Sequence, residues 1–223
     1  MTFTLPTALQ SEDDGAALRL LARYFAPAVG DPGSYTGAAW DDWDPSGRRQ
    51  QDIDEFTADD CMAVTLLSVN IPRQAAYRLL VKDRARYSAL LADVGPDRDL
   101  AEVAEPITDD RPASELYRAV RELPKVGRTK TSKLLARKRP ALIPIWDSVL
   151  GGVTQAGDYF WEPLRQQLRA NDAALHRRLL RLRDQAGLSA SVTALRVFDV
   201  VCWMEGKDKG YKVLDKDAPA QPA

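Results

Sequence analysis

LYRAVRELPKVGRTKTSKLLARKRPALIPIWDSVL, residues 116–150, is the most informative segment of this 223-residue chain. It predicts two short helices, near 111–122 and 128–137, on either side of the turn Leu123–Gly127. The second helix starts just after Gly127, so its free backbone N–H groups and the positive end of its dipole form an anion site. Glycine also leaves room for a phosphate to approach the backbone. The segment therefore predicts a helical hairpin that binds phosphate.

Basic residues are concentrated in this hairpin, although the whole chain carries a formal net charge of −1. That total argues against a nucleic-acid partner, because nucleic-acid-binding proteins usually show a basic excess. Residues 121–139, however, contain eight Lys or Arg residues and one Glu. A basic block at a helical hairpin is expected where a protein contacts a phosphate backbone.

The alternative is that these cations only coat a solvent-exposed helix face. We favour nucleic acid, because the basic block coincides with the turn glycine and with a helix start. The expected phosphate contacts are Lys125, Val126, Gly127, Arg128, Thr129 and Lys130.

The rest of the chain is also predicted to be helical, so the expected fold class is all-α. Apolar spacing and turn residues place further helices near 14–26, 58–69, 73–94, 159–170, 173–185 and 189–205. Thr57 and Asp60 have the spacing of a capping box at the start of one of them. Residues 29–56 form a long acidic loop that contains Tyr35, Trp40 and Trp43.

Composition excludes several classes of protein. No apolar run reaches the roughly 18–20 residues that a membrane helix needs, and the N-terminus lacks the features of a secretory signal. The two cysteines, Cys61 and Cys202, lie far apart in apolar surroundings, which indicates buried thiols in a reducing compartment. The chain has a single histidine. We therefore expect a cytoplasmic protein with no membrane contact, no metal and no organic cofactor.

Residues 116–150 resemble the helix-hairpin-helix and catalytic loop of the DNA glycosylase superfamily that includes endonuclease III and the adenine glycosylase. That family carries Leu-Pro-Gly-Val-Gly, a short helix, an apolar segment, and an aspartate that opens the next helix. Here Leu123–Gly127 reads Leu-Pro-Lys-Val-Gly, the apolar segment is Leu142–Trp146, and Asp147 follows Gly127 by twenty residues. The whole chain also resembles an uncharacterised bacterial family with this core.

The resemblance implies an all-α, two-lobed helical bundle of the glycosylase type, which binds double-stranded DNA. Its expected parts are an N-terminal helix and acidic loop (1–55), a helical barrel with the hairpin at 116–138 and the Asp147 loop (56–150), C-terminal helices that pack with the N-terminal helix (151–206), and a flexible tail (207–223). The sequence does not predict the oligomeric state.

Asp147 is the expected catalytic residue. In the family, this aspartate stabilises the cationic sugar as the bond to a flipped-out base breaks, and it helps to orient the attacking water. The alternative is structural, because Asp is among the best N-cap residues and Asp147 precedes a helical run. The two roles are compatible, because the family's aspartate also opens a helix.

Two departures from the family pattern refine the expected chemistry. Bifunctional members carry a Schiff-base lysine where this chain has Thr129, and Lys133, one turn further on, is a weak substitute. The cysteine quartet of cluster-bearing members is absent. The resemblance therefore implies a monofunctional enzyme without lyase activity or an iron–sulfur cluster. Lys125 replaces the first hairpin glycine, and it would be strained there if that position requires a positive φ.

Aromatic residues are candidates for the pocket that would hold a flipped base. Trp146 precedes Asp147, and the alternative is that it fills core space below the helix. Trp40 and Trp43 could wedge into an opened base stack, or the loop that carries them could fold back over the barrel. With Lys133, these three tryptophans form the expected base pocket.

Two other functions remain open from the sequence. One is a non-catalytic module that binds duplex DNA and retains the hairpin without the chemistry. The other is a protein-interaction or antitoxin-like helical domain, in which the acidic remainder of the chain contacts a basic partner.

Overall fold

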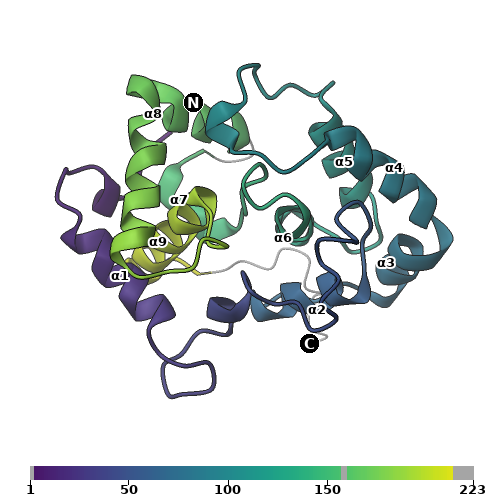
Figure 1. The fold of residues 1–223 in the computed structure, drawn as a ribbon, viewed down its shortest axis with the longest axis horizontal. Helices are drawn as coiled ribbons and strands as arrows, with labels where there is room; N and C mark the ends of the chain where they lie inside the picture. Colours follow the sequence, from purple (N-terminus) through teal and green to yellow (C-terminus); the bar gives the residue numbers. More distant parts are fainter. Residues whose placement is uncertain (1–2, 157–159, 213–223) are drawn as a thin grey trace, which may run out of the picture.

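The protein is all-helical over the residues that the structure describes. The computed structural model describes residues 3–156 and 160–212, and within these ranges it contains helices, turns and loops but no β-strand (Figure 1). The longer helices are α1 (Gly15–Phe25), α2 (Ala58–Leu66), α3 (Arg73–Tyr77), α4 (Arg84–Val94), α5 (Pro112–Arg121), α6 (Arg128–Lys138), α7 (Ser148–Thr154), α8 (Trp161–Gln185) and α9 (Ala194–Asp208). The predicted all-α class is confirmed.

The helices pack in two sets. Helix α9 packs against α1, α7 and α8, whereas α6 packs against α2 and α5, and α4 packs against α5. Figure 1 shows α1, α8 and α9 on one side of the molecule, α3, α4 and α5 on the other, and α6 between them. The chain starts in the first set, forms the second set from α2 to α6, and returns to the first set at α7.

Several helix boundaries were predicted correctly because their signals are local. The capping box at α2 forms: Oγ1 of Thr57 accepts from the Asp60 N–H, and the Asp60 carboxylate accepts from the Thr57 N–H. The expected break in α8 is present, since residues 170–173 have non-helical backbone angles. The predicted start of the last helix near 189 is wrong: α9 begins at Ala194, where the Thr193 side chain caps it by accepting from the Arg196 N–H.

The predicted continuous helix over 73–94 is wrong. Helix α3 passes into one π-helical turn, Arg78–Lys82, and α4 starts after Asp83, whose φ of −112° and ψ of 19° are not helical. The Asp83 N–H bonds to the Arg78 carbonyl at 2.8 Å, five residues back, and Arg78 Nε bonds to the Asp83 carboxylate at 2.7 Å. Because no glycine or proline marks this break, hydrophobic periodicity alone reads through it.

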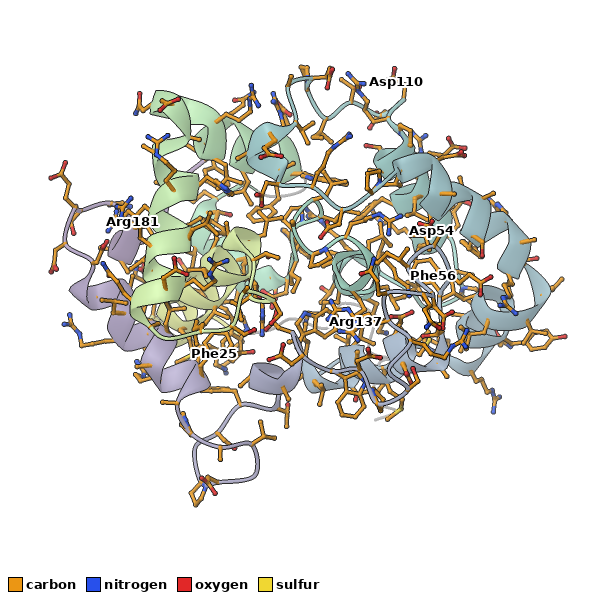
Figure 2. The ribbon with its side chains drawn as sticks, viewed as in Figure 1. Phe25, Asp54, Phe56, Asp110, Arg137 and Arg181 are labelled. Atoms are coloured by element: carbon orange, nitrogen blue, oxygen red, sulfur yellow. The ribbon has the colours of Figure 1, made fainter. Side chains whose placement is uncertain are left out.

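The acidic loop over 29–56 packs against α6. Arg137 Nη1 donates to the Trp40 carbonyl at 3.1 Å, and Lys138 Nζ donates to the Asp52 carbonyl at 3.0 Å. Arg137, labelled near the middle of Figure 2, is buried. The loop is therefore held by buried cations of the helix that follows the hairpin.

Two further predictions concern the membrane and the C-terminus. Among the described residues, no helix combines the length and apolar character needed to cross a membrane. The flexible tail was expected from residue 207, which is wrong at its start because α9 continues to Asp208. Residues 213–223 lie outside the described part of the chain.

Candidate functional site

The hairpin predicted between α5 and α6 is present. Leu123 and Val126 are buried beneath the turn, and the Val126 N–H bonds to the Leu123 carbonyl at 3.0 Å. Lys125 has a φ of 58°, which is the left-handed conformation that glycine adopts most easily. Gly127 is extended and stands at the N-cap of α6. The turn thus keeps a positive φ at its first glycine position although a lysine occupies that position.

Only part of the basic block lies near the hairpin turn. Lys133, Arg137, Lys138 and Arg139 are each 5% exposed or less. Arg137 Nε lies 3.5 Å from Asp60, an ion-pair contact too long for a good hydrogen bond, whereas Lys138 Nζ bonds to Asp60 at 2.6 Å. These four cations lie inside the protein, which corrects the interpretation of all eight as a phosphate-binding surface. The remaining cations are Arg121, Lys125, Arg128 and Lys130.

A cavity of about 260 Å³ lies where the two sets of helices meet. Lys133 of α6 and Asp147 at the start of α7 both line it, together with Arg196 and Asp199 of α9. Its aromatic lining residues are Tyr24, Tyr35 and Trp203. We call this cavity the central pocket. Segments that are distant in the sequence therefore bring two acids and two bases together in one place.

Asp147 is both a helix cap and a wall of the central pocket. Its Oδ1 accepts from the backbone N–H groups of Val149 at 3.0 Å and Leu150 at 3.1 Å. Ser132 of α6 fixes the preceding residue, because its hydroxyl bonds to both the N–H and the carbonyl of Trp146 at 3.0 Å. The predicted N-cap is confirmed, while the catalytic role stays a prediction. Sequence reasoning missed Ser132, whose contacts depend on the tertiary fold.

Lys133 is the basic group of α6 that reaches the central pocket. Its Nζ donates to the Leu67 carbonyl at 2.8 Å, at the C-terminal end of α2. Burial lowers the pKa of Lys133, and the carboxylates of Asp147 and Asp199 oppose this effect. Thr129, at the family's lysine position, is not among the lining residues of this pocket. Lys133, and not Thr129, therefore shares the pocket with Asp147 and interacts with its carboxylate.

Arg196 and Asp199 form a second charged group in the central pocket, which sequence reasoning missed. Arg196 Nη2 donates to the Tyr24 hydroxyl at 2.9 Å and to the Gly37 carbonyl at 2.8 Å, and Nη1 pairs with Asp199. Burial is the main cause that raises the pKa of Asp199 to about 6; Asp147 raises it further, while Arg196 and Lys133 lower it. The spacing of Arg196, Asp199 and Trp203 by three and four residues was an available signal for one shared helix face.

The structure does not place the expected tryptophans in the central pocket. Trp40 is 1% exposed, and the Arg137 guanidinium lies 5.6 Å from its ring centroid. Trp43 packs against the hydrophobic core, and its carbonyl accepts from Arg137. Trp146 lies beneath the Arg128 guanidinium, 3.6 Å from the ring centroid, and lines a separate cavity of about 150 Å³.

Other aromatic residues line the central pocket instead. Tyr24 and Tyr35 stack with centroids 5.1 Å apart and an interplanar angle of 8°. Trp203 meets Tyr35 edge to face at 5.5 Å. Tyr35 belongs to the 29–56 loop, so this loop contributes a wall of the pocket through a residue other than its tryptophans.

The fold and pocket define an all-helical protein with a charged cavity beside a helical hairpin. Residues 17–206 match a protein family described as a family of unknown function, DUF6308, and the chain belongs to this family. The matched region contains the hairpin and all four charged residues of the central pocket. Neither the curated proteins nor the solved structures include a significant match.

Proposed function

We propose that this protein binds duplex DNA through the α5–α6 hairpin and excises a modified or damaged base as a monofunctional DNA glycosylase. In this proposal, the two sets of helices correspond to the two lobes of helix-hairpin-helix glycosylases. The observation that carries the proposal is the position of Asp147. This residue has the spacing of the catalytic aspartate of the glycosylase superfamily, and it lines the central pocket, where the two sets of helices meet. Lys133, from the helix that follows the hairpin, lines the same cavity.

DNA contact is assigned to the hairpin turn and the first turn of α6. N–H groups in the first turn of a helix have no acceptor within the helix and attract a phosphate, and Gly127 carries no side chain to block it. Lys125 is exposed and adds a cation at the turn, and Lys130 Nζ bonds to the Lys125 carbonyl at 3.1 Å. Because half of the basic block is buried, we expect modest affinity that depends on salt.

The central pocket is assigned to the extruded base. Tyr35 and Trp203 offer aromatic surfaces against which a base can stack, and Asp147 supplies the negative charge that stabilises a cationic sugar. Lys133 is assigned a positioning role, because its ammonium group bonds to the Leu67 carbonyl and so holds the end of α2 at the pocket. Treatment with borohydride should therefore trap no covalent complex between the protein and DNA.

The proposal is tested with a panel of duplexes that carry single modified bases, followed by alkaline cleavage of the products. Asp147→Asn is the informative variant, because Asn also caps helices and its unfolding midpoint should stay close to that of the wild type. We expect the wild type to release at least one base and Asp147→Asn to release it at least 100-fold more slowly. Release of no base, or equal release by a folded Asp147→Asn protein, would refute the proposal.

The second candidate function is a non-catalytic module that binds duplex DNA. It is favoured by the burial of Asp147, which is 2% exposed and occupied as a helix cap. Both functions predict that Lys125→Glu combined with Lys130→Glu weakens duplex binding. The matched control reverses two exposed cations, Arg73 on α3 and Arg181 on α8, the second of which is labelled in Figure 2. This control should bind more strongly than the hairpin variant. Duplex binding without any base release would select the module.

If the two hairpin reversals leave duplex binding unchanged, the hairpin is not the DNA-binding surface and both functions fail. Absence of binding even at low salt would then favour the protein-interaction domain, because low salt strengthens contacts with phosphate.

A further inference from the structure

Helix α9 presents one charged and aromatic face to the central pocket. Arg196, Asp199, Val200 and Trp203 all line the cavity, and their spacing of three and four residues puts them on one side of the helix. Asp147 reaches the same cavity from α7. Two carboxyl groups from different elements therefore border one small cavity. The sequence indicated only Asp147, through its distance of twenty residues from Gly127.

The surroundings of the two carboxyl groups differ. Asp147 accepts two backbone N–H bonds at the start of α7. Asp199 is 6% exposed and pairs with Arg196 on its own helix. The other groups that act on the pKa of Asp199 are Asp147 of α7 and Lys133 of α6; burial, the largest cause, raises that pKa to about 6. Asp199 can therefore hold or release a proton near neutral pH.

The second partner of Arg196 has a different location. Asp41, in the 29–56 loop, lies 3.2 Å from Arg196 Nε and is as buried as Asp199, at 4% exposed. Asp41 is not among the lining residues of the central pocket. The two carboxylates thus share one arginine, but only Asp199 faces the space assigned to the base. This difference separates a role in charge pairing from a role in the reaction.

We propose that Asp199 is the general acid that protonates the departing base. This inference rests on the proposed glycosylase function. Asp199 lies one helical turn from Trp203, on the face that would stack with the base, whereas Asp147 is assigned to the sugar. General acids of this kind contribute about 10²–10⁴-fold to rates.

The proposed step balances as a hydrolysis. The N-glycosidic bond breaks, and its electron pair stays on the base, which takes the proton from the Asp199 carboxyl group. Water adds to the sugar carbon and loses a proton to solvent, and Asp199 then regains a proton from solvent. Protonated Asp199 is the active form, so base release should be fastest below pH 6 and should fall as pH rises above it.

The experiment compares wild type, Asp199→Asn and Asp41→Asn in single-turnover base release between pH 5 and pH 8. The duplex is the one that gives release in the panel above, and thermal unfolding of each protein is recorded at each pH. We expect Asp199→Asn to lose about 100-fold at pH 6 and to lose the pH dependence. We expect Asp41→Asn to keep the wild-type shape of the profile, even where its unfolding midpoint drops as much as that of Asp199→Asn.

Three outcomes would overturn the inference. If Asp199→Asn and Asp41→Asn lower the rate equally and both keep the pH profile, Asp199 acts only through Arg196. If Asp199→Asn is as fast as the wild type, the Asp199 carboxyl group does not protonate the base. If the wild type itself releases no base, the glycosylase function fails first, and the role of Asp199 fails with it because no base departs.

Discussion

The left-handed conformation of Lys125 leads to a quantitative prediction about the hairpin. At a φ of 58°, a residue with a side chain pays about 1–2 kcal/mol relative to glycine. Glycine loses more conformational entropy on folding, which offsets about 0.5–1 kcal/mol of that gain. Lys125→Gly should therefore be more stable than Lys125→Ala by about 0.5–1 kcal/mol, which for a chain of this size is about 1–4 °C in unfolding midpoint.

The same pair of variants separates backbone strain from charge. Both remove the exposed ammonium group, and both keep the carbonyl to which Lys130 donates. If Lys125 contacts one phosphate, both variants should lower the slope of log K against log salt by about 0.9. Thermal unfolding gives the first quantity, and fluorescence anisotropy with a labelled duplex at several salt concentrations gives the second.

Thermal stability tests the backbone strain at Lys125, and the salt slope tests its contact with phosphate. A Lys125→Ala protein that is at least as stable as Lys125→Gly would show that the turn has no left-handed requirement. A salt slope that is unchanged in both variants would show that Lys125 does not contact the phosphate backbone.

Two further predictions concern other charged groups. Asp60→Asn keeps a capping side chain but removes the carboxylate that lies 2.6 Å from the buried Lys138 ammonium group. It should therefore lower the free energy of unfolding, measured with urea, by about 3–5 kcal/mol. The control Asp59→Asn, at the neighbouring position, should change it by less than about 0.5 kcal/mol. Hydrogen bonds, the largest from Arg165, lower the pKa of Glu162 from 4.5 to about 2. Stability from ionised Glu162 should therefore be present above pH 4.5 and lost as pH falls toward 2, by about 1–2 kcal/mol, and Glu162→Gln should remove this part of the pH dependence in urea unfolding.

The features that the sequence predicted correctly depend on local chemistry. The capping box of Thr57 and Asp60, the turn at 123–127 and the N-cap at Asp147 each involve residues within a few positions of one another. The hydrogen bonds that produce these features form between residues that are close in sequence, so the features can be predicted without knowledge of the fold. The π-helical turn at Arg78–Lys82 is also local, but it was missed because no glycine or proline marks it in the hydrophobic pattern.

The central pocket could not be predicted, because it forms from tertiary contacts. Asp199 appears in the sequence as a polar interruption of an apolar run, and nothing nearby indicates that it faces Asp147. The tryptophans of the acidic loop stand out in the sequence, yet Tyr35 is the loop residue that reaches the pocket. Position along the chain gives no information on which aromatic ring faces which cavity.

The charge pattern of the sequence also could not show which cations are buried. The basic block over 121–139 reads as a single surface in the sequence, but Arg137 and Lys138 are buried and contact Asp60 and carbonyls of the 29–56 loop. One carboxylate of the loop, Asp54, also pairs with the buried Arg139, which follows α6. Net charge and charge clustering predict where partners bind only after such internal pairing is known.

In the proposed complex, the α5–α6 hairpin holds a phosphate backbone while the central pocket receives an extruded nucleotide. A crystal structure of Asp147→Asn bound to a duplex that carries the base released in the panel would show both contacts at once. We expect a phosphate at the backbone N–H groups of residues 127–130 and the modified base against Tyr35 and Trp203. A duplex that remains fully stacked, or that lies on another face of the protein, would contradict it.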